Sequence, residues 1–246
     1  MTRKIALWAA CLPVALLLSA GLVLAANDST RPEAKAAARP LPLAKSNLFI
    51  EINATDGDAG LQLNLDGEKW NNMRIVNPRG ETILDVSGSS RLRGYGLTGL
   101  TFESAEPPFR QFPFSRFKAR FPAGTYRFRG TTVGGRQLVG SDRLTHRIPQ
   151  KPVITAPAED ARVSTRGLVV RWNKVTRPQG IRIVHYQVIV TQQEPERVLD
   201  LTMPPTATAV SIPAEFLQPR KEYALEILAR EASGNQVITE IAFRTT

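Results

Sequence analysis

The chain has 246 residues and a formal net charge of +10, from 32 Lys and Arg against 22 Asp and Glu, and 42% of its residues are hydrophobic. This balance of apolar and charged residues is typical of globular proteins and excludes a disordered chain. The single cysteine excludes a disulfide-rich scaffold, and the length allows one or two domains.

Residues 1–26 are predicted to direct export. Arg3 and Lys4 precede an uncharged apolar run that extends to Ala26, and Val23-Leu24-Ala25 is typical of a signal-peptidase cleavage site. The run is also long enough to span a bilayer, so an uncleaved N-terminal anchor is the alternative. We therefore expect the protein in the periplasm or outside the cell, either released or held at the membrane through this segment alone.

Residues 27–45 mix alanine with three prolines and show no periodic apolar face, so they are predicted to form an extended linker. The only cysteine, Cys11, lies within the export segment, which removes thiol chemistry from the exported part. Without Arg3 and Lys4 the chain still carries 30 basic against 22 acidic residues. An exported protein with this charge is expected to meet an envelope glycan, lipid headgroups or a partner protein, and not nucleic acid. The sequence leaves the oligomeric state open.

From residue 46 onward, short runs of alternating apolar and polar residues recur between Gly, Pro, Asn and Asp, and no run of helical length has a 3.6-residue period. The predicted fold class is therefore all-β, with tandem antiparallel β-sandwiches. Residues 46–150 are expected to form a sandwich or jelly roll and residues 151–246 a second sandwich. The strands predicted in the first domain are residues 48–52, 61–65, 74–76, 82–86, 100–103, 116–121, 126–129 and 144–147.

The second set of predicted strands covers residues 153–156, 168–172, 181–191, 197–202, 209–212, 222–230 and 237–244. The order Pro152, Val170-Arg171-Trp172, Tyr186-Gln187-Val188 and Leu217-x-Pro219-x-x-x-Tyr223 resembles the fibronectin type III domains, which have an immunoglobulin-like fold. The resemblance implies a core that includes Trp172, Tyr186, Leu217 and Tyr223, with a tyrosine corner at Tyr223.

One departure from the family lies after Pro219, where Arg220-Lys221 stands in place of the usual Gly-Thr. The departure weakens the prediction of the turn at this point and leaves the apolar pattern intact. No Arg-Gly-Asp is present, so integrin binding is not carried over. Membership of this family would imply a spacer or a binding module.

Residues 109–129 contain six basic residues, no acidic ones and seven of the chain's 17 aromatic residues. If residues 122–125 form a hairpin loop, the alternation turns Phe117, Phe121, Tyr126 and Phe128 into the core. The other face then collects the candidate anion-binding or partner-binding residues Arg116, Lys118, Arg120, Arg127 and Arg129. Like charges directly opposed in a sheet are unfavourable, so solvent and salt, acidic neighbours or an anionic ligand must compensate them.

Four oxygen-bearing side chains in and after a Gly-rich loop are candidate calcium ligands: Asn53, Asp56, Asp58 and Asp66. Calcium is the one cofactor that the sequence suggests. The spacing is not that of an EF-hand loop, and Asp-Gly pairs are ordinary turn chemistry, so a plain hairpin turn is the alternative.

No catalytic residue is predicted. The chain lacks the Gly-x-Ser-x-Gly and His-Glu-x-x-His motifs, and a dinucleotide-like glycine string at residues 94–99 is followed by a predicted strand where a helix is required. The sequence therefore predicts a non-catalytic binding protein, with the second domain as a spacer or second binding module. The alternative is a carbohydrate-active enzyme, because glycoside hydrolysis needs two nearby carboxylates and the first domain offers Glu51, Asp56, Asp58, Asp85, Glu103 and Glu106.

Overall fold

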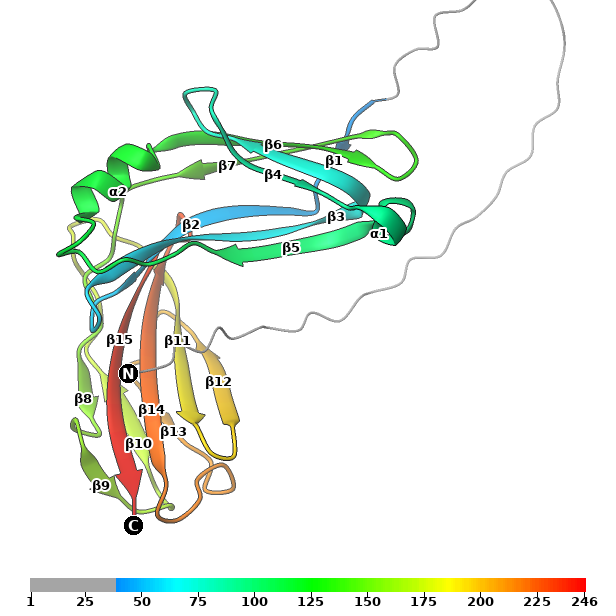
Figure 1. The fold of residues 1–246 in the computed structure, drawn as a ribbon. Helices are drawn as coiled ribbons and strands as arrows, with labels where there is room; N and C mark the ends of the chain where they lie inside the picture. The colour runs from blue at the N-terminus through cyan, green and yellow to red at the C-terminus, as the bar shows by residue number, and fades with distance from the viewer. Residues whose placement is uncertain (1–38) are drawn as a thin grey trace, which may run out of the picture. The chain divides into compact units, whose positions relative to one another are not determined.

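A computed structural model describes residues 39–246 (Figure 1). The predicted export segment and most of the predicted linker lie outside the described residues. The described part consists of strands and two short helices, which confirms the all-β prediction. Neither of these helices is long and apolar enough to cross a membrane.

The first half of the described chain contains seven strands and both helices. Their bounds are β1 Leu41–Pro42, β2 Lys45–Asn53, β3 Asp58–Val76, β4 Thr82–Ser87, α1 Ser90–Tyr95, β5 Leu97–Glu103, α2 Phe114–Arg120, β6 Gly124–Thr132 and β7 Gln137–Leu144. The 19-residue β3 covers two of the predicted strands, residues 61–65 and 74–76, without a break.

The long strand β3 connects two layers of this half (Figure 1). Its first part pairs antiparallel with β2 and β5, and its second part pairs with β4 and β6, with shifts of register around Trp70. Strand β7 pairs with β6, and β1 runs parallel to β7. Such irregularities bend a strand, which lets one strand serve both layers.

A first hydrophobic core lies between these layers. Leu61, Leu63 and Leu65 alternate with less buried residues along β3, as expected for a strand with one face on a core. The core also contains fully buried side chains from β2, β3 and β6: Leu48, Ile50, Trp70, Met73, Ile75, Tyr126 and Phe128.

The predicted strand at residues 116–121 is wrong, because these residues lie in or just after helix α2. The apolar residues Phe114, Phe117 and Phe121 recur at the three- and four-residue spacing of a helix. The Phe117 ring stacks on Phe114 at a centroid distance of 5.8 Å and is tilted against Phe121 at 4.9 Å. Phe117 is the buried member of the set. The predicted hairpin between residues 116–121 and 126–129 therefore does not form, and β6 pairs with β3 and β7 instead.

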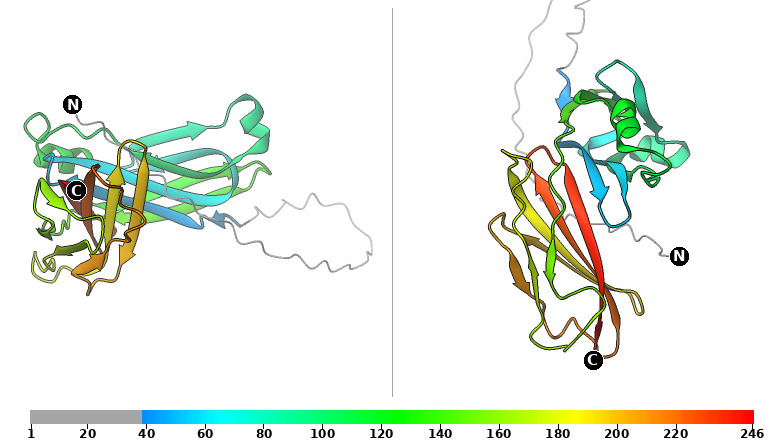
Figure 2. Two further views of the ribbon diagram at one scale, coloured as in Figure 1. Left: turned by 90° about the horizontal axis from the view of Figure 1, so that it is seen from below. Right: turned by 90° about the vertical axis from the view of Figure 1, so that its left-hand side faces the viewer.

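The second half contains eight strands. Their bounds are β8 Ile154–Ala156, β9 Ala161–Val163, β10 Val169–Trp172, β11 Ile183–Gln192, β12 Arg197–Met203, β13 Ala209–Ser211, β14 Glu222–Glu231 and β15 Gln236–Thr245. Strands β13, β10 and β8 form one sheet, and β12, β11, β14 and β15 lie side by side in the other (Figures 1 and 2). The short β9 runs parallel to the end of β15.

This half has the fibronectin type III fold that the sequence predicts. Trp172, Tyr186, Leu217 and Tyr223 are all buried in the second hydrophobic core. The Tyr223 hydroxyl accepts a hydrogen bond from the Gln218 backbone N–H at 2.7 Å and donates one to Gln192 Oε1 at 2.8 Å, which is a tyrosine corner. Arg220, at the position where the family usually has glycine, adopts a left-handed backbone with φ 56°.

The two cores belong to one compact unit, Ala38–Thr246. Residues Glu51–Asn53 of β2 pair in parallel with residues Gln236–Ile238 of β15. Buried Asn235 strengthens this connection, because its side chain accepts a hydrogen bond from the Ile50 N–H and donates to the Thr145 and Arg147 carbonyls. A division into separate domains near residue 150 stays a prediction.

Candidate functional site

The outward face of the β4–β3–β6–β7 layer carries four arginines. Along β6, exposed Arg127 and Arg129 alternate with buried Tyr126 and Phe128. We call this surface the arginine face and define it by the outward side chains Arg74 of β3, Asp85 of β4, Arg127 and Arg129 of β6, and Arg143 of β7.

The strand register places like charges opposite each other. Arg129 pairs directly with Arg74, and Arg74 pairs on its other side with Asp85. The Arg74 guanidinium donates from Nε and Nη2 to Asp85 Oδ2 at 2.9 and 2.7 Å. Among residues 39–246, Arg127 and Arg129 make no ion pair. The face therefore keeps two guanidinium groups whose charge only solvent or a ligand can balance.

A hollow of about 790 Å³ lies on this face. Arg74, Asp85 and Arg129 line it together with four neutral polar side chains, Asn72, Ser87, Thr131 and Gln137, and with the apolar Leu138 and Val139. Guanidinium groups form charge-assisted hydrogen bonds with carboxylate, sulfate or phosphate oxygens, and amides and hydroxyls hydrogen-bond to neutral hydroxyls. The hollow is thus suited to an acidic, hydroxyl-bearing ligand.

The five predicted anion-binding residues do not share one sheet face. Arg127 and Arg129 lie on the arginine face, but Arg116, Lys118 and Arg120 lie on helix α2. The Lys118 ammonium stands 5.4 Å from the centre of the Phe114 ring, a cation–π contact within the helix. Sequence reasoning missed Arg74 and Arg143, because only the strand pairing brings them beside β6.

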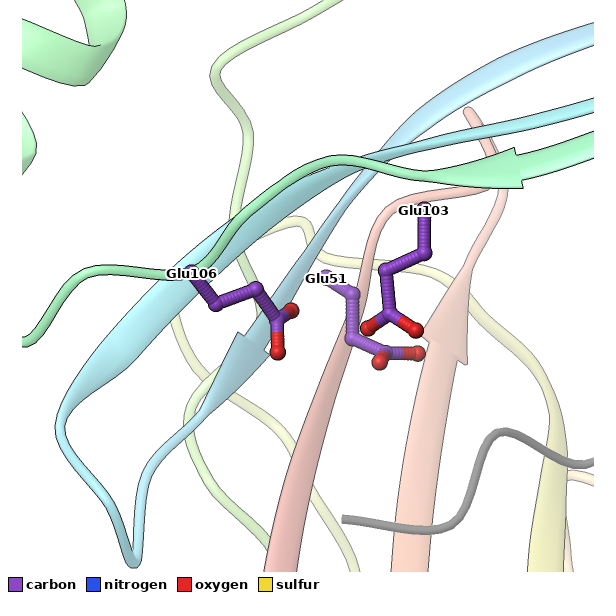
Figure 3. A group of neighbouring side chains, drawn as sticks. All are labelled: Glu51, Glu103 and Glu106. Carbon is purple, nitrogen blue, oxygen red and sulfur yellow. The ribbon is translucent and has the colours of Figure 1, made fainter.

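A second cluster consists of three carboxylates, Glu51 on β2, Glu103 on β5 and Glu106 just after β5 (Figure 3). One oxygen of each lies within 4.8 Å of the other two. A Cβ atom at Gly60 would overlap Glu106 Oε1, so this approach depends on glycine at that position. All three were among the acidic residues that the sequence offered for a carboxylate pair, and β3 brings them together by pairing with β2 and β5 on either side.

Burial raises the pKa of Glu51 to about 7. The hydrogen bond from the Gln236 amide and the charge of Arg230 act in the opposite direction, whereas Glu103 and Glu226 add to the increase. Arg230 stacks over the Phe49 ring at 4.4 Å, and its own pKa is lowered by burial. Glu51 is therefore a protonatable group held at the junction of β2 and β15.

The nearby β14 and β15 strands add two more acidic groups with raised pKa values. Burial, together with Glu240, Asp200 and Asp56, raises the pKa of Glu226 to about 7. Burial also raises the pKa of Glu240. We call Glu51, Glu103, Glu106, Glu226 and Glu240 the acidic junction. Carboxylates that are buried and close together hold protons more tightly than exposed ones, and Glu51, Glu226 and Glu240 follow that rule.

The four predicted calcium ligands do not converge. Asn53 closes the β2–β3 turn by accepting hydrogen bonds from the Thr55 and Asp56 N–H groups and donating to Asp56 Oδ2. Asp58 begins β3 opposite Asn53, whereas Asp66 lies eight residues further along β3, opposite Lys45. Asn53 and Asp56 thus hydrogen-bond within the turn, as in a plain hairpin, and a calcium site here stays a prediction. The glycine string at residues 94–99 runs into strand β5, in agreement with its exclusion as a dinucleotide site.

No protein-family model and no curated protein sequence matches this chain. Solved structures similar to it include the FN1–FN3 domains of chicken CNTN1, at 11% identity and a TM-score of 0.34 over 84% of this chain and 64% of that one. A two-domain fibronectin type III segment of chicken tenascin shows 11% identity and a TM-score of 0.30 over 82% of this chain and 99% of that one. An α-L-rhamnosidase of Streptomyces avermitilis shows 17% identity and a TM-score of 0.31, over 39% of this chain and 10% of the enzyme. Similarities this distant carry no argument about activity or ligand.

Proposed function

We propose that this chain is an exported, non-catalytic binding protein whose arginine face recognises an acidic glycan. The observation that carries the proposal is the direct pairing of Arg74 with Arg129 beside the hollow, where Asp85 is the one carboxylate on the face. A sheet stabilised by its core tolerates opposed like charges when a bound anion or solvent neutralises them. The fibronectin type III half then serves as a spacer or second binding module.

The hollow favours a glycan over the two other anionic partners that the sequence allows. Its amide and hydroxyl side chains, such as Asn72 and Gln137, match a ligand that carries many hydroxyl groups along with its acidic ones. A flat layer of lipid headgroups would contact the rim of a hollow and leave these groups unpaired. A protein surface would bring fewer hydroxyls and more apolar area.

Replacing Arg127 and Arg129 together with glutamate is expected to weaken binding to immobilised polygalacturonate at least about tenfold, because each hydrogen bond to a charged group contributes about 1.5–3 kcal/mol. Wild-type binding should weaken steeply between about 50 and 500 mM salt. The matched control is Arg171→Glu, an equally exposed strand arginine on β10. The proposal would be contradicted if the Arg127→Glu/Arg129→Glu variant bound the polysaccharide as well as Arg171→Glu does. It would also be contradicted if the wild type bound anionic vesicles but not the polysaccharide.

A second candidate function is glycoside hydrolysis through the acidic junction. This candidate rests on the three carboxylates within 4.8 Å of one another and on the raised pKa of Glu51. Glycoside hydrolases use a protonated carboxyl group beside an ionised one. Against it, Glu51 is engaged by the Gln236 and Gln62 amides at the β2–β15 pairing. Release of reducing ends from polysaccharide by the wild type, lost in Glu103→Gln, would favour this candidate.

A further inference from the structure

Helix α1 is a single exposed turn that contributes nothing to either core. None of its six residues is buried, and Leu92 and Tyr95 are 50% and 80% exposed. These two residues are three positions apart and therefore lie on the same side of the turn. Large apolar side chains that stay this exposed point to an external partner.

The neighbouring turn between β6 and β7 extends this apolar surface. Val133 in that turn is 37% exposed, and a Cβ atom at Gly96, which ends α1, would stand 2.8 Å from its Cγ2 atom. The Val133 N–H donates to the Lys69 carbonyl at 2.9 Å, which ties the turn to β3. We call Leu92, Tyr95 and Val133 the apolar tip.

Backbone contacts hold the apolar tip in place. The Gly88 N–H donates to the Asn71 carbonyl before α1, and the Gly96 N–H donates to the Leu92 carbonyl at its end, both at 2.8 Å. Gly96 has φ 89°, a conformation that favours glycine. The chain therefore presents Leu92 and Tyr95 from a backbone that is held at both ends of α1.

Four basic side chains surround the apolar tip: Lys69, Arg91, Arg93 and Arg136, all exposed. Within residues 67–70, 88–97 and 132–137 the one acidic residue is Glu68. Tyrosine and leucine enter the interfacial region of a bilayer, and lysine and arginine bind anionic headgroups while their stems cover apolar surface. The combination is complementary in charge and polarity to an anionic membrane surface.

We propose that the apolar tip docks this protein on a bilayer that carries anionic lipids. Leu92 and Tyr95 insert at the level of the headgroups, and the four basic residues around them bind the lipid phosphates. This contact uses other residues than the arginine face, although the two surfaces meet where Ser87 is followed by Gly88 and Arg136 by Gln137. It also differs from the membrane contact that the sequence predicts, which involves the N-terminal segment alone.

The test uses the chain from residue 27 onward, which omits the apolar N-terminal segment and retains the whole compact unit Ala38–Thr246. It is sedimented with vesicles of phosphatidylcholine alone or of phosphatidylcholine and phosphatidylglycerol in equal parts. We expect binding to the anionic vesicles and about tenfold weaker binding for the double variant Leu92→Ser/Tyr95→Ser, equivalent to about 1.4 kcal/mol. The matched control is Val153→Ser, because Val153 is 43% exposed and lies outside the apolar tip.

A second measurement reports insertion directly. The chain from residue 27 has no cysteine, so Tyr95→Cys or Val153→Cys provides a single attachment point for an environment-sensitive fluorophore. We expect a blue shift on anionic vesicles for the label at position 95 and none at position 153. The inference is overturned if the label at position 95 does not respond, or if only the Arg127→Glu/Arg129→Glu variant loses vesicle binding. Glycan binding by the Leu92→Ser/Tyr95→Ser variant should stay unchanged, which separates this inference from the proposed function.

Discussion

Replacing Trp172 with alanine is expected to lower the free energy of unfolding by about 3–5 kcal/mol, the usual cost of removing a large aromatic side chain from a core. Trp172 is 2% exposed and packs against Tyr186 with ring centroids 5.5 Å apart. Its indole N–H makes no hydrogen bond within the described residues, so the loss comes from packing.

Urea denaturation followed by far-ultraviolet circular dichroism measures this loss, since the signal does not depend on the tryptophan that is removed. Val153→Ala is the control, because Val153 is exposed and its truncation should change stability by less than about 0.5 kcal/mol. A midpoint for Trp172→Ala equal to that of the wild type would show that the ring does not fill the core between the sheets.

Raising the pH from about 4.5 to about 8 is expected to destabilise the folded chain through the acidic junction. The pKa of Glu51 is about 7 in the folded state against 4.5 as its ordinary value. Below pH 4.5 the carboxyl is neutral in both states. Between pH 4.5 and 7 the unfolded state releases the proton first, so stability falls as pH rises. Glu51 alone accounts for about 3 kcal/mol across this window, and Glu226 acts in the same direction.

The substitution Glu51→Gln removes the titrating group and should flatten the decline between pH 5 and 8 by about 3 kcal/mol. The matched control is Glu222→Gln on β14, an exposed carboxylate paired with Arg244, which should leave the decline unchanged. Unfolding is measured in EDTA, because three converging carboxylates can also bind a divalent cation. A stability that rises over this pH range, or the same pH dependence in Glu51→Gln and wild type, would refute the raised pKa.

The second half of the fold could be predicted from the sequence because its signals are local. Alternation along β14 places Tyr223, Leu225 and Ile227 on one buried face, and Trp172 on β10 of the other sheet lies in the same core. The aromatic residues that mark this fold are all buried where the resemblance implies. Arg220, where the family usually has glycine, adopts a left-handed backbone two residues after Gln218, whose N–H donates to the tyrosine corner.

The fold of the first half was harder to predict from the sequence, because it depends on pairing between strands that are distant along the chain. Residues 114–121 carry phenylalanines at helical spacing. The basic residues between them also alternate with apolar ones, which is the pattern of a strand. The structure forms the helix, which buries Phe117. No local signal indicates that β3 continues through Trp70 into a second layer.

The candidate sites likewise divide into features that follow from local sequence and features that depend on strand pairing. The outward positions of Arg127 and Arg129 follow from alternation along one strand. The pairing of Arg129 with Arg74, and the approach of Glu51 to Glu103, depend on which strands become neighbours. The apolar tip was not expected, since a helix without buried residues leaves no periodic apolar pattern in the sequence.

The most direct test of the acidic-glycan proposal is a backbone amide NMR titration of the chain from residue 27 with a short oligogalacturonate. We predict chemical-shift changes concentrated on β3, β6 and β7 around Arg74, Arg129 and Gln137, with smaller changes after Arg129→Gln. Changes centred on Glu51 and Glu103, or no changes at any ligand concentration, would contradict the proposal that the arginine face binds an acidic glycan.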